Sequence, residues 1–313
     1  MRRYLISMDG GGTKTEFCIK DMQKGTLFFF KFGSSNYKSS SAEYVKRNIM
    51  GGFKECLKQL EVGNDEIAYV VCGIAGLDSR EDYEFYHNII IEMGISEERL
   101  YIGNDSEIIL EEIEEGICIV AGTGSIVTGI NFEGTRWRAG GWGPPLSDKG
   151  SGWWMGSKVL EYYIKAWDES VYFNEYCNYL NLCFQIQNRR DAIEKLTDLT
   201  TEDVASLAKS IMEFAETGDD FCNWIVNQSI KELSELIKTV YVKLNFLKRK
   251  EVPMIEVGSL FKNLNFKTKL EETLKNELGI LNLKYKMLEN GPAHYEILLA
   301  EKKYKQLFKE EEE

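Results

Sequence analysis

The stretch Asp9–Thr15, which reads DGGGTKT, has the residue types and the spacing that phosphate binding needs. Its three successive glycines carry no Cβ, so the backbone can take positive φ and turn its N–H groups toward an anion. A hydroxyl and an ammonium group follow, and the carboxylate of Asp9 is placed to hold a hydrated Mg²⁺. Taken by itself, the pattern fits a phosphate cradle and an ordinary tight hairpin equally well. The residues of this cradle are Gly10, Gly11, Gly12, Thr13 and Lys14.

A second glycine turn of the same kind follows later in the chain. An apolar run over 116–121 leads into it, and another run over 126–131 leaves it. Two such turns, each opening a domain-sized stretch, are far less expected by chance than one, so the repeat favours phosphate binding at both. The residues of the second turn are Gly122, Thr123, Gly124 and Ser125.

Strands must hold these turns in place. Runs over 4–8 and 16–20 predict a β-hairpin around the first turn, and 26–32 predicts a third strand. The continuous apolar run over 67–75 predicts a strand buried on both faces of a sheet. A three-stranded meander followed by alternating strands and helices indicates an α/β fold.

The rest of the chain is predicted to be mainly helical, with few further strands. The Gly-, Trp- and Pro-rich stretch over 137–155 is predicted to be a shaped loop, within which Ser151 caps the next helix. Short strands are predicted over 253–257 and 283–286. Apolar spacing predicts helices over 44–60, 80–93, 106–115, 152–166, 221–247 and 294–308, with further helices between 170 and 248.

Composition excludes several classes of function. The 313 residues are 43% apolar and carry a net charge of −12, which argues against nucleic acid or an anionic membrane as the main partner. Seven scattered cysteines without a C-x-x-C pair are typical of reduced thiols in a cytoplasmic protein. Only two histidines occur, so a histidine base is not expected. No signal peptide or membrane-spanning run is predicted.

The two turns, taken with several shorter motifs, resemble the sugar kinase, heat-shock protein 70 and actin superfamily. Within it the chain is most similar to N-acetylglucosamine kinases of the BadF/BadG/BcrA/BcrD ATPase family, which also includes the ATPase activators of benzoyl-CoA reductase and 2-hydroxyacyl-CoA dehydratase. The motifs that carry the resemblance are Asp9–Thr15, Ser35-Asn36, Asn104-Asp105, Ala121–Ser125, Gly140–Ser151, Gly218-Asp219, Gly258-Ser259 and Gly291–Ala293.

The resemblance implies two RNase H-like (actin-like ATPase) domains flanking a cleft for ATP and a sugar. The first would span 1–115 plus 292–313, and the second would span 116–291 with a helical insertion. Both glycine turns would bind the ATP, and Thr123 would reach its γ-phosphate. Gly258 and Ser259, together with Gly218, would line the adenosine pocket. Mg²⁺ as cofactor and a homodimer are also implied.

The general base is expected to be Asp105, because the resemblance places the base of these kinases at that position. It would take the proton of the sugar hydroxyl. From the residues alone, the favoured explanation of an aspartate between a strand and a helix is a helix N-cap, and one residue can serve as both cap and base.

The sugar is expected to contact Asn36, Asn104, Asp105, Gly141, Trp142 and Asp148. The resemblance gives Asn36 and Asp148 as ligands of sugar hydroxyls, although both also suit turn positions. Trp142 can present a ring face or an amide to the sugar, or it can be a core aromatic. Leu77 and Asp78, after the buried strand, are further residues that can face the sugar.

The implied function is ATP-dependent phosphorylation of an amino sugar, N-acetylglucosamine or N-acetylmuramic acid, at the 6-hydroxyl, with a role in cell-wall recycling. The Pro144-Pro145 pair stiffens the loop that selects the substrate, so glucosamine stays an alternative. A second alternative is an ATPase activator, but no cysteine occurs between Cys118 and Cys177 to hold its iron–sulfur cluster. A sugar-sensing repressor would need a DNA-binding helix-turn-helix, for which 1–8 is too short.

Overall fold

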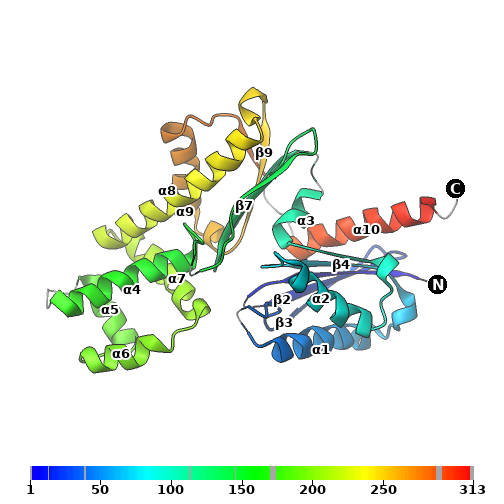
Figure 1. The fold of residues 1–313 in the computed structure, drawn as a ribbon, viewed down its shortest axis with the longest axis horizontal. Coiled ribbons are helices and arrows are strands. Elements are labelled where there is room, and N and C mark those ends of the chain that lie inside the picture. The colour runs from blue at the N-terminus through cyan, green and yellow to red at the C-terminus, as the bar shows by residue number, and fades with distance from the viewer. Residues whose placement is uncertain are drawn as a thin grey trace. The chain divides into compact units, whose positions relative to one another are not determined.

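The chain divides into two compact units in the computed structural model (Figure 1). Unit 1 comprises Met1–Glu114 and Met287–Glu313, and unit 2 comprises Glu115–Lys286. Each unit contains one five-stranded sheet with helices packed against it, so the predicted α/β class is confirmed. The structure describes residues 2–310 apart from 13, 39, 112, 114, 145, 170–173 and 287–290.

The sheet of unit 1 has the strand order β3-β2-β1-β4-β5. The first three strands form the predicted antiparallel meander, while β4 and β5 run parallel to β1. All eight residues of β4 are buried, as expected for a strand covered on both faces. The strands are β1 (Tyr4–Gly10), β2 (Thr15–Asp21), β3 (Leu27–Phe32), β4 (Ile67–Ile74) and β5 (Leu100–Gly103).

Helices cover both faces of this sheet (Figure 1). One face packs against a cluster that includes Ile49 of α1 and Tyr86 of α2. The other face packs against Ile108 of α3 and Ile297 of α10, so the last helix of the chain returns to the first sheet. The helices are α1 (Ala42–Leu60), α2 (Arg80–Glu92), α3 (Asp105–Glu111) and α10 (Pro292–Glu310).

The sheet of unit 2 has the strand order β10-β9-β6-β7-β8 and repeats the antiparallel meander in β6, β7 and β8. The prediction of a loop from residue 137 was wrong at its start, because Arg136–Gly140 forms the edge strand β8. Its pairing with β7 supplies an order that the mixed residues of this stretch do not signal. The strands are β6 (Gly116–Ala121), β7 (Ser125–Ile130), β8 (Arg136–Gly140), β9 (Val252–Val257) and β10 (Leu283–Lys286).

The helices of unit 2 lie mainly between β8 and β9 in the chain. Ser151 accepts a hydrogen bond from the Trp154 N–H at 3.1 Å and caps α4 as predicted. A Cβ on Gly156 would lie 2.0 Å from the Val204 carbonyl oxygen, so glycine permits the close packing of α4 on α7. The helices are α4 (Gly152–Glu169), α5 (Glu175–Cys183), α6 (Arg189–Thr197), α7 (Thr201–Glu216), α8 (Asp220–Lys243) and α9 (Leu264–Glu272).

All seven cysteines are free thiols, and only Cys183 is exposed. Among the helices that the structure describes, none combines the length and the apolar character that crossing a bilayer would need.

Candidate active site

The first glycine turn joins β1 to β2 at the carboxyl end of β1. The Gly11 N–H donates to the Lys14 carbonyl oxygen at 2.9 Å, and the Lys14 side chain is exposed to solvent. Gly10 and Gly11 do not adopt the positive φ that glycine permits. Glycine is needed here for space, because a Cβ on Gly10 would lie 2.5 Å from Ser35 Oγ. Thr13, expected to bind phosphate, lies outside the described residues.

Asp105 lies at the same edge of the sheet as this turn. Asp9 on β1 is in register with Gly73 on β4, and Gly73 is in register with Gly103 at the end of β5. Asp105 follows two residues later, at the start of α3. In open α/β sheets, ligands bind beyond the carboxyl ends of parallel strands, and this edge has that position.

The side chain before Asp105 caps α3. Asn104 Oδ1 accepts hydrogen bonds from the Ser106 N–H at 3.1 Å and from Ser106 Oγ at 2.7 Å. Asp105 Oδ1 also accepts from the Ser106 N–H, at 2.8 Å. Asn104 is buried and its side-chain oxygen already accepts hydrogen bonds from the first turn of α3. This residue of the predicted sugar set therefore has a structural role in unit 1. Asn104 and Asp105 thus share the Ser106 N–H, so the Asp105 carboxyl combines a contact with the start of α3 with its place at the sheet edge.

Both half-buried carboxyls of this edge bind protons more tightly than carboxyls in water. Burial raises the pKa of Asp9 from 3.8 to about 7, and the charges of Asp105 and Glu16 act in the same direction. Burial also raises the pKa of Asp105, to about 6. The hydrogen bond from the Ser106 N–H lowers this pKa, and the charge of Asp78 raises it. Perturbed carboxyls of this kind gather at functional sites, where a base must titrate near neutral pH.

A third carboxyl, Glu296 on α10, was missed in the sequence. It is fully buried, and neither of its carboxylate oxygens has a hydrogen-bond partner in the structure. Burial raises its pKa well above 4.5, and Asp9, Asp105 and Glu16 reinforce the shift. One signal was available: Glu296 falls on the apolar stripe of the last helix, three residues after Ala293 and four before Ala300.

The residues at this edge fit a magnesium ion held mainly by water and phosphate. Among the described residues, no three His, Cys, Asp or Glu side chains are grouped closely enough to hold a metal by themselves. Mg²⁺ does not require such a cage, since it keeps several waters and takes one or two carboxylates beside substrate phosphates. Asp9 and the unpartnered Glu296 are acids of the required kind.

Two loops carry the predicted sugar residues of unit 1. Asn36 Nδ2 donates to the Ala75 carbonyl oxygen at 3.1 Å, which ties the loop after β3 to the loop after β4. Leu77 and Asp78 belong to the second of these loops. The Asp78 side chain lies 3.6 Å from Lys38 Nζ, so it forms an ion pair with the first loop.

The buried Asp82 at the start of α2 holds both loops. It accepts hydrogen bonds from the Tyr37 hydroxyl, from Lys38 Nζ at 3.0 Å and from the Asp78 N–H at 2.9 Å. Although burial acts in the opposite direction, these bonds keep the pKa of Asp82 well below its usual range. Asp82 is therefore ionised and fixes the position of Asn36 relative to Asp78.

The second glycine turn joins β6 to β7 at the carboxyl end of β6. A Cβ on Gly124 would lie 2.6 Å from Asp148 Oδ2, so Asp148 packs directly on the turn. Gly122 and Gly124 do not adopt positive φ either. The turn is tied to α4, because the Gly152 N–H donates to the Gly122 carbonyl oxygen at 2.8 Å and the Trp153 N–H donates to Thr123 at 3.1 Å.

The end of β9 meets this turn. Gly258 has a φ of +114°, and a Cβ there would lie 2.2 Å from the Ala121 carbonyl oxygen. Ser259 Oγ lies 3.6 Å from the place of a Cβ on Gly122. Unit 2 thus brings together the second glycine turn, Asp148 and the Gly258-Ser259 loop.

The remaining predicted residues of unit 2 lie in loops. The Gly141 N–H donates to the Ser125 carbonyl oxygen at 2.9 Å, which places the loop after β8 beside the second turn. Trp142 is 68% exposed, so the alternative of a core aromatic is wrong. Gly218 is an exposed residue between α7 and α8 with a φ of +98°, and its N–H donates to the Ala215 carbonyl oxygen at 3.2 Å.

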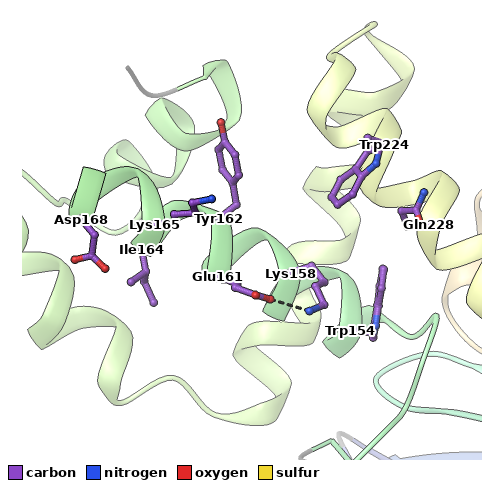
Figure 2. Close-up of a pocket in the computed structure, with 9 residues that line it drawn as sticks. All are labelled: Trp154, Lys158, Glu161, Tyr162, Ile164, Lys165, Asp168, Trp224 and Gln228. Carbon is purple, nitrogen blue, oxygen red and sulfur yellow. Dashed lines mark hydrogen bonds and ion pairs between the residues drawn. The ribbon is translucent and has the colours of Figure 1, made fainter. Parts of the chain in front are cut away.

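A hollow of about 550 Å³ lies elsewhere on unit 2, between α4 and α8. Figure 2 shows Trp154, Tyr162 and the Lys158–Glu161 ion pair on α4 and Trp224 on α8 along its walls. None of the predicted site residues lines this hollow. The hollow is therefore lined by residues other than the predicted ones, although Trp154 directly follows Trp153, which is bonded to the second glycine turn.

Known proteins of similar sequence are sugar kinases by name. An N-acetylmuramic acid/N-acetylglucosamine kinase of Clostridium acetobutylicum is 30% identical over 273 residues, which cover 84% of this chain and 87% of that protein. An N-acetyl-D-glucosamine kinase of Dictyostelium discoideum is 28% identical over 291 residues, which cover 88% and 90%.

Solved structures show the same fold. A protein of Chromobacterium violaceum, named as a candidate N-acetylglucosamine kinase, superposes with a TM-score of 0.75 at 19% identity and covers 96% of this chain and 99% of its own. The model of the BadF/BadG/BcrA/BcrD ATPase family matches residues 6–285. The resemblance inferred from the glycine turns is thus confirmed, and the chain belongs to the BadF/BadG/BcrA/BcrD ATPase family.

Proposed function

We propose that this protein transfers the γ-phosphoryl group of ATP to a hydroxyl of an amino sugar. The observation that carries the proposal is Asp105, a carboxyl with a pKa near 6 at the sheet edge that also holds the first glycine turn. The relatives named as N-acetylglucosamine and N-acetylmuramic acid kinases support the amino sugar as acceptor.

The chain's own groups bind, orient and move one proton in this reaction. The amides of the two glycine turns, with Lys14, bind phosphate oxygens of the nucleotide. Asp105 accepts the proton of the attacking hydroxyl as its oxygen bonds to the γ-phosphorus, while the bond to the β-phosphate oxygen breaks and ADP leaves. Mg²⁺, when bound near Asp9, neutralises negative charge on the phosphates.

The acceptor specificity is proposed to come from the loops around Asn36, Trp142 and Asp148. Asn36 is held by its hydrogen bond to the Ala75 carbonyl oxygen, and Asp148 is held against Gly124. The exposed indole of Trp142 offers an apolar face for a sugar ring or an acetamido methyl group. N-acetylglucosamine and N-acetylmuramic acid, phosphorylated at the 6-hydroxyl, are the proposed substrates, and recycling of cell-wall sugars is the corresponding role.

The alternative of a reductase or dehydratase activator receives no support from the cysteines. Cys118 is buried within β6, and the turn that follows it contains no thiol. Glucosamine remains the second candidate acceptor, because a glucosamine kinase of Vibrio cholerae is 27% identical over 169 residues. That match covers 53% of this chain, so it supports glucosamine less strongly than the longer matches support the N-acetylated sugars.

A coupled assay of ADP release over a panel of sugars tests the proposal. The panel contains N-acetylglucosamine, N-acetylmuramic acid, glucosamine and glucose, each with MgATP. We expect release to depend on an N-acetylated sugar and to be slowest with glucose. Release at the same rate with and without every sugar would contradict the proposed kinase activity.

A further inference from the structure

Glu296 is an anomaly that the reaction as described does not use. Buried carboxyls are normally hydrogen-bonded, because an unpaired one carries a large desolvation penalty. Both oxygens of Glu296 lack a partner in the structure, although the side chain is fully buried. A glutamate kept only for stability would be expected to bond to a nearby donor or carbonyl group.

The fold places this carboxyl at the active-site edge. Ser7 Oγ donates to the Ala293 carbonyl oxygen at 2.6 Å, which joins the start of α10 to β1 two residues before Asp9. The point that a Cβ on Gly73 would occupy lies 1.9 Å from Glu296 Oε1 and 3.4 Å from the Asp105 Cα. Glycine at 73 on β4 thus leaves room for the Glu296 carboxyl, and β4 lies between β1, which carries Asp9, and β5, which leads to Asp105.

The charges around Glu296 are of one sign. Asp9, Asp105 and Glu16 are the groups that act on it, and all three are acidic. The cation that acts on Asp9 is Lys14, whose side chain is exposed. Like-charged carboxyls that act on one another in a buried site repel unless they bind protons or a cation.

We propose that Glu296 is an acidic partner of the hydrated divalent cation that accompanies the nucleotide, sharing its water ligands with Asp9. This inference rests on the proposed function for the presence of a metal–nucleotide complex. Outer-shell acids that accept hydrogen bonds from metal-bound water orient the ion and add to its affinity. The unpartnered oxygens of Glu296 are the acceptors that such waters need.

The test compares how strongly Mg²⁺ increases the affinity for ADP in the wild type and in Glu296→Gln. Calorimetry gives the Kd of ADP in EDTA and in excess MgCl₂, and their ratio is the metal effect. We expect Glu296→Gln to reduce this ratio by about tenfold, the lower end for an outer-shell partner, with the Kd in EDTA unchanged. A structural disturbance would weaken ADP binding in both buffers.

Two further variants make the result interpretable. Glu301→Gln is the matched control, because Glu301 lies on the same helix but pairs with Lys20 and Lys305, and its metal effect is expected to equal that of the wild type. If Glu296→Gln does not fold, Glu296→Asp keeps the charge and withdraws it by one methylene, and a reduced metal effect is again expected.

A metal effect in Glu296→Gln equal to that of the wild type would overturn the proposal. It would also be overturned if Mg²⁺ did not change the Kd of ADP for the wild type. The measurement uses no sugar. A protein that shows the Glu296-dependent metal effect but no sugar-stimulated ADP release would uphold this inference and reject the proposed function.

Discussion

Replacing Asp9 by asparagine is expected to stabilise the metal-free protein at pH 8 while abolishing turnover. The pKa of Asp9 is raised from 3.8 to about 7 in the folded chain. Because the pKa of Asp9 is higher in the folded chain than in the unfolded chain, protonated Asp9 stabilises the fold relative to ionised Asp9. Its contribution is complete below pH 3.8 and is lost as the pH rises through about 7.

The size of the effect follows from that shift. About three pKa units at 1.36 kcal/mol each give an upper limit of ~4 kcal/mol at pH 8, and less than ~1 kcal/mol near pH 4. Asp9 keeps part of its surface in water, so we expect about half of the limit, ~2 kcal/mol. For a unit of this size that corresponds to a rise in Tm of roughly 4–8 °C.

Differential scanning calorimetry in EDTA at pH 5 and pH 8 measures this effect. Asp21→Asn is the control of opposite sign, because the hydrogen bond from Arg3 lowers the pKa of Asp21 to about 2. That carboxylate stabilises the fold above pH 3.8, so its loss should lower Tm at both pH values. If Asp9→Asn has the same Tm as the wild type at pH 8, the reasoning that the site's carboxyls are held at an energetic cost is refuted.

Three further predictions concern the kinetics of the reaction, two of them kcat and one KM. Asp105→Asn should lower kcat about 10²–10⁴-fold with ADP affinity unchanged by calorimetry, and near-normal turnover would reject Asp105 as the base. Because Asp105 must be ionised to accept a proton and its pKa is about 6, kcat at saturating MgATP should fall about tenfold per unit below pH 6; a profile that stays flat to pH 5 would contradict this assignment. Asp82→Asn should raise the KM for the sugar about tenfold with little change in the KM for ATP, because Asp82 positions Asn36. The control Glu84→Gln, on the exposed side of the same helix, should change neither KM.

Much of the fold was predictable because its signals are local. The strand boundaries around each glycine turn follow from apolar runs interrupted by glycines, and β6 and β10 begin and end where the sequence pattern places them. Strand β8 was missed because Arg136–Gly140 mixes charged, aromatic and small residues at a sheet edge. Its order comes from pairing with β7, a contact that a local pattern does not contain.

The site was predictable only in part, for a related reason. The turns and Asp105 carry motifs that can be read within a few residues. Glu296 could be noticed as a charged residue on an apolar stripe, and the resemblance assigned 292–313 to the first domain. Which carboxyls act on Glu296 depends on how α10 packs against β1 and β4, which the sequence does not contain. The reason for glycine at positions 10 and 124 was also hidden, since the atoms that exclude a Cβ belong to Ser35 and Asp148.

The central claim, phosphoryl transfer from ATP to an amino sugar, is tested most directly by identifying the product. The protein is incubated with MgATP and N-acetylglucosamine or N-acetylmuramic acid, and the mixture is analysed by mass spectrometry and by ³¹P–¹H correlation NMR. We predict one sugar monophosphate per ADP, with the phosphorus coupled to the protons on carbon 6. ADP formed together with free phosphate and unmodified sugar would contradict the account and indicate an ATPase.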